Sequence, residues 1–221
     1  MKKMVIFDMD GVIFDSETAM FKEWQLTAAR YGLKDIEIPY RDCIGVNAAR
    51  CAGIFTAFYG AGFPYESYHD ETAASFRKKY DGGRLPVKKG VRELLSYLKG
   101  NGYFTAIASS TVTDTVKAEI TDAGLISFID RIVGGDMVAK SKPEPDIFLK
   151  AAEGISLPLS SIYVIEDSFN GIRAAAAAGM IPVMVPDMLF PDDEIRKLAA
   201  GVFDDLLQVR DMLKTKDAAA L

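Results

Sequence analysis

Acidic side chains follow two of the short apolar runs in this sequence. Asp8 and Asp10 come directly after Met4–Phe7, and Glu166 and Asp167 come after a later run. Carboxylates two positions apart in an extended segment point to the same side, and they repel each other unless a cation neutralises one of them. We therefore expect a hard divalent cation, Mg²⁺, bound through the oxygens of these residues.

Hydroxyl and ammonium groups occur at comparable places. Ser109 and Ser110 follow the apolar run Phe104–Ala108, and Lys142 lies in the loop before a helical pattern. Such groups hold phosphate oxygens, and a neighbouring aspartate could attack phosphorus to form an aspartyl phosphate. A second carboxylate could carry the proton. Residue chemistry alone does not decide which of the first two aspartates attacks.

The elements that must position these groups are strands that alternate with helices. Amphipathic segments separate the apolar runs, which predicts an α/β fold with a doubly wound, mostly parallel, Rossmann-like sheet. In such sheets ligands bind beyond the carboxyl ends of the strands, so the polar groups should converge on one crevice. The predicted strands are Met4–Phe7, Phe104–Ala108, Ile132–Val133, Ile162–Ile165, Ile181–Val185 and Val202–Phe203.

One part of the chain breaks this alternation. Between the first apolar run and Phe104 the sequence reads as helices over Glu17–Tyr31, over Tyr40–Tyr59 with interruptions, and over Tyr65–Tyr80. We therefore predict a catalytic core of residues 1–15 and 84–221, with an inserted all-helical cap domain of residues 16–83.

Composition excludes several classes of protein. The 221 residues carry 26 basic and 31 acidic side chains, a net charge of -5, with no basic run, which argues against a nucleic-acid partner. No stretch approaches the roughly 20 apolar residues of a membrane span, and the first apolar run is too short for a signal peptide. A cytoplasmic protein is expected. Cys43 and Cys51 fit no metal or disulfide pattern and are expected to be free thiols. The single His69, in a polar helical stretch, leaves catalysis to carboxylates, lysine and hydroxyl groups.

Four segments of the chain resemble the motifs of the haloacid dehalogenase superfamily, and together they cover essentially its whole length. In chain order they read FDMDGVIFDSE, IASSTVTDTV, SKPEPDIFLKAA and VIEDSFNGIRAAAAAGM. The first and fourth are long and specific. The chain is most similar to the β-phosphoglucomutase-like phosphatase subgroup, whose members carry a helical cap after the first motif.

The resemblance implies a role for each matching residue. Asp8 would be the nucleophile and Asp10 the general acid and base. The residues implied to hold the phosphoryl group are Ser109, Ser110 and Lys142. The residues implied at the Mg²⁺ site are Asp8, Asp10 through its backbone carbonyl, Asp167, and Glu166 assisting from outside. The expected activity is hydrolysis of a small phosphorylated metabolite by a monomer or weak dimer.

Two departures from the subgroup bear on the alternatives. Mutases of this group carry a His five residues after the position of Asp15, where this chain has Met20, and the spacing from Gly45-Val46 to Arg50 also differs. Both departures put a hexose-phosphate mutase in doubt without affecting a phosphatase. A catalytically idle binding module is the remaining alternative. Asn47 and Arg50 are the candidate substrate contacts in the cap.

Overall fold

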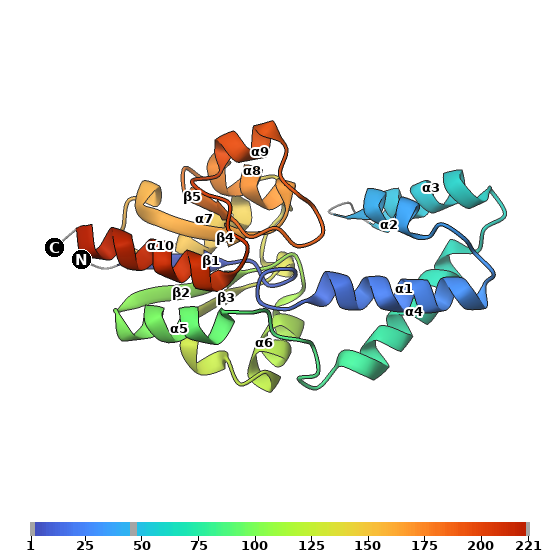
Figure 1. Cartoon of the computed structure of the whole chain (residues 1–221), viewed down its shortest axis with the longest axis horizontal. Helices are drawn as coiled ribbons and strands as arrows, with labels where there is room; N and C mark the ends of the chain where they lie inside the picture. The colour runs from blue at the N-terminus through green and yellow to red at the C-terminus, as the bar shows by residue number, and fades with distance from the viewer. Residues whose placement is uncertain (1–2, 45–47, 220–221) are drawn as a thin grey trace. The chain divides into compact units, whose positions relative to one another are not determined.

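The computed structural model describes residues 3–44 and 48–219. Contacts divide the chain into two compact units, one formed by Met1–Asp15 with Leu85–Leu221 and the other by Ser16–Arg84. The first unit contains all the strands of the described chain (Figure 1). These are β1 (Lys3–Phe7), β2 (Tyr103–Ala108), β3 (Arg131–Val133), β4 (Ile162–Glu166) and β5 (Ile181–Met184).

The five strands form one parallel sheet in the order β3-β2-β1-β4-β5. The central strand β1 pairs with β2 and β4 on its two sides, so that Phe7 lies opposite both Ile107 and Ile165. Its residues Met4–Phe7 are fully buried, as expected for a parallel strand covered on both faces. The predicted doubly wound sheet is confirmed.

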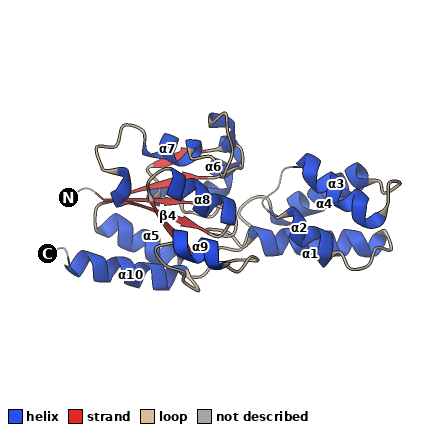
Figure 2. Cartoon of the chain, turned by 90° about the horizontal axis from the view of Figure 1, so that it is seen from above, coloured by secondary structure: helices blue, strands red, loops and turns tan. Residues whose placement is uncertain are grey.

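Helices cover both faces of this sheet. On one face α7 and α8 pack through an apolar cluster that contains Met4, Ile6, Phe148 and Ala174. On the other face α5 packs against β2 and α10 (Figure 2). The helices of this unit are α5 (Val91–Gly100), α6 (Thr113–Asp122), α7 (Asp146–Ala152), α8 (Phe169–Ala177), α9 (Asp193–Leu198) and α10 (Leu206–Ala219), with short 3-10 turns η1 (Ile126–Phe128), η2 (Gly135–Met137) and η3 (Leu159–Ser161).

All the regular secondary structure in the described residues of the second unit is helical. Its helices are α1 (Ser16–Arg30), α2 (Glu37–Cys43), α3 (Ala48–Tyr59) and α4 (Tyr65–Tyr80). Its core is aromatic: the ring of Trp24 makes edge contacts with Tyr40, Phe55 and Tyr68, at centroid distances of 5.2, 4.9 and 5.5 Å. The buried hydroxyl of Tyr68 donates to the backbone oxygen of Trp24 at 2.7 Å, which satisfies its polar end.

The chain leaves and re-enters the first unit through a short paired segment. Phe14 bridges Val87 in antiparallel fashion. On either side of this bridge, the amide of Asp15 donates to Pro86 O at 2.9 Å and the amide of Lys88 to Ile13 O at 2.9 Å. The two connections to residues 16–84 therefore lie side by side within the first unit.

Two details differ from the sequence-based expectations. Cys43 and Cys51 are joined by a disulfide, with Cα atoms 5.1 Å apart, so the prediction of free thiols is wrong. The segment Tyr40–Tyr59 is divided between α2 and α3, which brings these two cysteines together. Val202 forms only a single parallel bridge to Met184, so the sixth predicted strand is absent from the described sheet.

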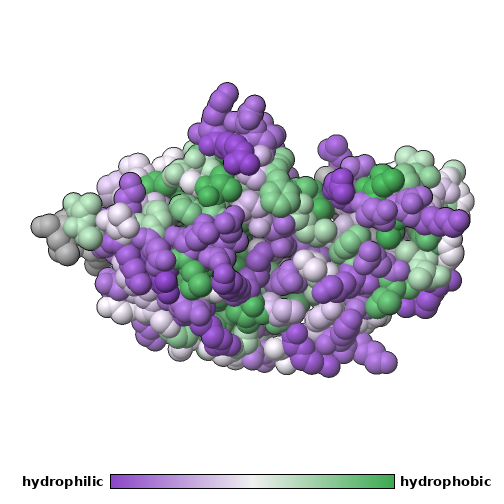
Figure 3. All heavy atoms as spheres, in the orientation of Figure 1, coloured by the Kyte–Doolittle hydropathy of each residue, from purple (hydrophilic) through white to green (hydrophobic). Residues whose placement is uncertain are grey.

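The surface view in Figure 3 shows mostly hydrophilic side chains, with hydrophobic ones in small groups between them. Apolar groups scattered in this way are normal on a globular protein. Within residues 3–44 and 48–219, no helix combines the length and the apolar character that crossing a membrane would require.

Candidate active site

The strand ends bring the predicted polar residues to one edge of the sheet. Asp8 directly follows β1, and its amide extends the pairing with β4 by donating to Ile165 O at 2.9 Å. Ser109 directly follows β2, and its amide donates to Val133 O at 3.1 Å. Glu166 is the last residue of β4. Because the strands are parallel and in register, their carboxyl ends lie at the same edge.

Lys142 links these residues through a buried ammonium group. It lies in the loop before α7, and its side chain is 8% exposed. Its Nζ contacts Oδ1 of Asp8, lies 2.6 Å from Oε1 of Glu166, and donates to Ala108 O at 3.2 Å. The structure thus places the predicted lysine against two of the four predicted carboxylates, Asp8 and Glu166.

Glu166 is held rigidly from its other side. Its Oε2 accepts hydrogen bonds from the amides of Asp167 and Ser168 at 3.1 and 3.0 Å, and from the Ser168 hydroxyl at 2.9 Å. A Cβ at Gly171 would lie 1.8 Å from the Glu166 carboxyl carbon, so α8 approaches this carboxylate through a residue without a side chain. Ser168 also caps α8 by accepting from the Gly171 amide at 3.0 Å.

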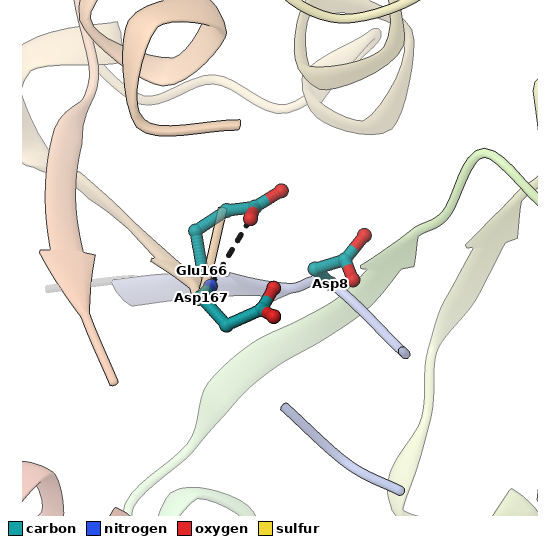
Figure 4. A group of neighbouring side chains, drawn as sticks. All are labelled: Asp8, Glu166 and Asp167. Atoms are coloured by element: carbon teal, nitrogen blue, oxygen red, sulfur yellow. Dashed lines mark hydrogen bonds between the residues drawn. The ribbon is translucent and has the colours of Figure 1, made fainter. Parts of the chain in front are cut away.

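Three carboxylates form a group that could hold a metal ion. Asp8, Glu166 and Asp167 each offer an oxygen within 4.8 Å of the others, and Figure 4 shows the Asp167 carboxylate directed toward Asp8. Gly11 completes the cradle: it has φ +75°, and a Cβ there would lie 2.2 Å from Oδ2 of Asp167. Such a set of hard oxygen donors around a confined space fits Mg²⁺.

The charges at this edge are unbalanced. Burial raises the pKa of Asp8 to about 8; the Lys142 ammonium counteracts this, while the carboxylates of Glu166 and Asp10 add to it. Burial alone would lower the pKa of Lys142, but the Asp8 and Glu166 carboxylates outweigh it and raise that pKa. Three clustered carboxylates face one ammonium, so a bound cation would favour the ionised form of Asp8.

Asp10 lies beside this group but points to a different partner. Its Oδ2 accepts a hydrogen bond from Oγ1 of Thr111 at 3.1 Å. The amide of Thr111 in turn donates to Oγ of the buried Ser109 at 3.1 Å. Thr111 was not among the residues predicted for the site from the sequence; its place two residues beyond Ser109 was the available signal. Ser110, between them, is exposed.

The predicted substrate contacts in the cap lie in the second unit. Arg50 is exposed on α3, and Asn47 lies outside the described residues. His69 is on α4, where its Nδ1 lies 3.3 Å from Asp70 Oδ1 and its ring stacks on Tyr65. These contacts are those of a surface histidine.

Comparison with known proteins gives a family for this arrangement. A family model described as haloacid dehalogenase-like hydrolase matches residues 5–185. A phosphorylated carbohydrates phosphatase from Thermotoga maritima is 31% identical over 180 residues, which cover 80% of this chain and 81% of that protein. The range matched by the family model, residues 5–185, contains every residue of the candidate site.

Solved structures share the fold over nearly the whole chain. A haloacid dehalogenase family hydrolase from Deinococcus radiodurans, solved with bound phosphate and sodium, has a TM-score of 0.80 at 26% identity and covers 96% of this chain and 94% of that one. CbbY from Rhodobacter sphaeroides, solved in complex with phosphate, has a TM-score of 0.74 at 26% identity and covers 95% of this chain and 96% of that one.

Proposed function

The chain belongs to the haloacid dehalogenase-like hydrolase family, and from this premise we propose that it is a Mg²⁺-dependent phosphatase of small phosphomonoesters that works through a phosphorylated Asp8. The observation that carries this proposal is the buried contact of Lys142 with both Asp8 and Glu166 beside Asp167. This arrangement combines a carboxylate nucleophile, a cation for phosphate oxygens and an oxygen-rich metal site.

The proposed reaction consists of two displacements at phosphorus. A carboxylate oxygen of Asp8 attacks phosphorus, the bond to the ester oxygen breaks, and Asp10 donates a proton to the leaving alcohol. Asp10 then takes a proton from water, the water oxygen attacks phosphorus, and the bond to Asp8 breaks to release inorganic phosphate. Acid and base roles in successive steps suit one carboxyl group that is held in place, and the Thr111 hydroxyl supplies that restraint at 3.1 Å.

The phosphoryl oxygens need positive charge and hydrogen-bond donors. Lys142 would provide the charge, and Ser109 with Ser110 would provide hydroxyl groups at the end of β2. Asp8, Asp167 and the backbone carbonyl of Asp10 would hold Mg²⁺, with Glu166 orienting Lys142. When bound, Mg²⁺ supplies charge neutralisation for the phosphoryl oxygens.

We place the substrate among phosphorylated sugars and similar metabolites. The support is the Thermotoga maritima relative, which is named for phosphorylated carbohydrates. The helical unit of residues 16–84 is proposed as a cap that excludes bulk water and selects the substrate, with Arg50 and Asn47 as its candidate contacts.

A phosphate-release assay on a panel of phosphorylated metabolites and a generic aryl phosphate tests this proposal. We expect turnover with Mg²⁺, loss of turnover with a chelator, and a fall in kcat of at least about 10⁴-fold in Asp8→Asn. Asp114→Asn, which makes the same change at an exposed position of α6, is the control and should keep full activity. Full activity in pure Asp8→Asn protein would refute the nucleophile assignment.

The same material separates hydrolysis from phosphoryl transfer between two positions of a sugar. Incubation with β-glucose 1-phosphate and a bisphosphate primer should release inorganic phosphate. Formation of glucose 6-phosphate without free phosphate would instead identify a mutase. An inactive protein across the whole panel would favour a binding module.

A further inference from the structure

A cavity lies in the first unit, at the amino ends of the strands. It has a volume of about 470 Å³ and is lined by residues that begin β1 and β2, by η1, and by the loop after α7. Strand β1 runs from Lys3 at this cavity to Phe7 next to Asp8. At about 3.3 Å per residue, the cavity is roughly 16 Å from the candidate active site. We call it the basal pocket.

The walls of the basal pocket are aromatic and aliphatic. Phe104, Ile155 and Leu157 line it while packing against the apolar core from outside, and each is only partly buried. Phe128 of η1 adds a further ring. The volume falls within the range of small-molecule sites, which are typically concave, mostly apolar and equipped with a few polar groups.

Two ammonium groups and one carboxylate supply those polar groups. Lys99 donates to the backbone oxygen of Ser127 at 2.6 Å and lies over the Phe128 ring at 5.4 Å. A carbonyl does not neutralise its charge, and among residues 3–44 and 48–219 Lys99 takes part in no ion pair. Lys3, by contrast, is paired with Asp217 at 2.5 Å.

Asp130 defines what else a ligand would carry. Its Oδ2 accepts from the Thr105 amide at 2.8 Å, which fixes the carboxylate at the wall of the pocket. It would repel a ligand that is anionic throughout, and it would accept a hydrogen bond from an N–H group. Lys99 favours an anion, the apolar walls favour a ring, and Asp130 favours a donor.

We propose that the basal pocket binds a small aromatic anion that also carries an N–H donor. The ring would lie between Phe104, Phe128 and Leu157, with its anionic group toward Lys99 and its N–H toward Asp130. The pocket is separate from the candidate active site, and this proposal does not depend on the phosphatase activity.

Anilinonaphthalene sulfonate carries aromatic rings, an anionic sulfonate and an N–H group. It becomes fluorescent in apolar sites, so it serves as the probe. A fluorescence titration of the folded wild-type chain should show saturable binding of one dye per chain. Lys99→Glu should weaken binding at least about tenfold by reversing the charge at the wall, and Ser156→Trp should abolish it by filling the pocket. Lys117→Glu and Lys117→Trp, made at an exposed position of α6, are the matched controls and should bind as the wild type does.

Two further measurements make the test specific. Near-UV circular dichroism of every variant establishes that the dye is not reporting loosened packing. Orthovanadate with Mg²⁺, a mimic of the phosphoryl group, should leave dye binding unchanged. Displacement of the dye by orthovanadate, wild-type affinity in Lys99→Glu and Ser156→Trp, or no binding to the wild type would each overturn the proposal.

Discussion

Thr111 donates a hydrogen bond from Oγ1 to Oδ2 of Asp10 over 3.1 Å. If Asp10 exchanges protons in both proposed displacements, this contact matters because it fixes the direction in which the carboxyl group points. Thr111→Val keeps the shape and the backbone contacts of the residue while removing the donor. We expect kcat to fall about tenfold with little change in KM, since a positioned acid and base contributes roughly 10²–10⁴-fold in total.

The conservative variant distinguishes positioning from a general effect on folding. Thr111→Ser keeps the hydroxyl and should restore most of kcat. Thr121→Val removes an exposed hydroxyl that donates to the Lys117 backbone oxygen within α6, and it should leave kinetics unchanged. Equal kinetics for Thr111→Val and the wild type would rule out the positioning role.

Removal of the buried ammonium should affect stability as well as activity. In Lys142→Met the carboxylates of Asp8 and Glu166 lose a shared counter-charge, and breaking such a buried pair costs about 3 kcal/mol. Urea unfolding should report this loss, and Mg²⁺ should stabilise the variant more than the wild type. Lys140→Met removes only an exposed pair with Glu144 at 3.9 Å, so it should change stability by less than about 0.5 kcal/mol.

Substitution of Gly11 should reduce activity and weaken Mg²⁺ binding, in addition to any effect on the stability of the fold. In Gly11→Ala the new methyl group would meet Oδ2 of Asp167, 2.2 Å away, and displace it. A displacement of this size should lower activity about 10²-fold and raise the Mg²⁺ concentration needed for half-maximal rate. Gly124→Ala is the control, since it has φ +68° with no atom within 4 Å. It should cost only about 1 kcal/mol of backbone strain and leave the Mg²⁺ requirement unchanged.

Asp217 should make stability depend on pH. Its burial would raise its pKa, but hydrogen bonds from Lys3, Tyr97 and Tyr103 outweigh that effect and lower the pKa. A lowered folded-state pKa means stabilisation that is complete above the unfolded-state value of about 3.9 and is lost as pH falls through the folded-state pKa. Asp217→Asn should therefore cost about 2 kcal/mol at neutral pH and progressively less below about pH 4. Urea unfolding at several pH values measures this, with exposed Asp122→Asn as the control; a pH-independent cost would contradict it.

The disulfide should stabilise the helical unit. Cys43 and Cys51 are 8 residues apart. Closing a loop of that size lowers the conformational entropy of the unfolded chain and so raises its free energy by about 2–3 kcal/mol. A reducing agent should lower the melting temperature of the wild type. The double variant Cys43→Ser, Cys51→Ser should start at the lower value and show no response. A wild-type melting temperature that is insensitive to complete reduction would argue against the bond.

The sheet and the strand-end carboxylates could be predicted because they depend on local pattern. A buried parallel strand such as β1 is a continuous apolar run, and the residue that follows it, Asp8, must lie at the carboxyl edge. The disulfide and the partner of Asp10 could not be predicted in this way. Whether Cys43 meets Cys51, or Thr111 meets Asp10, depends on how loops fold back in space. The basal pocket could not be predicted from the sequence either, because its walls come from four segments that are far apart in the chain.

The antiparallel bridge between Phe14 and Val87 should allow the helical unit to be removed or replaced. Asp15 and Pro86 are joined by a 2.9 Å hydrogen bond. The two ends of the inserted segment, residues 16–84, are therefore held together by contacts within the first unit itself. A short turn grafted between those two positions should leave the sheet and its acidic edge folded. Helical units from relatives could then be inserted into the same first unit. Such hybrids would separate the contribution of the sheet to the reaction from the contribution of the helical unit to the choice of substrate.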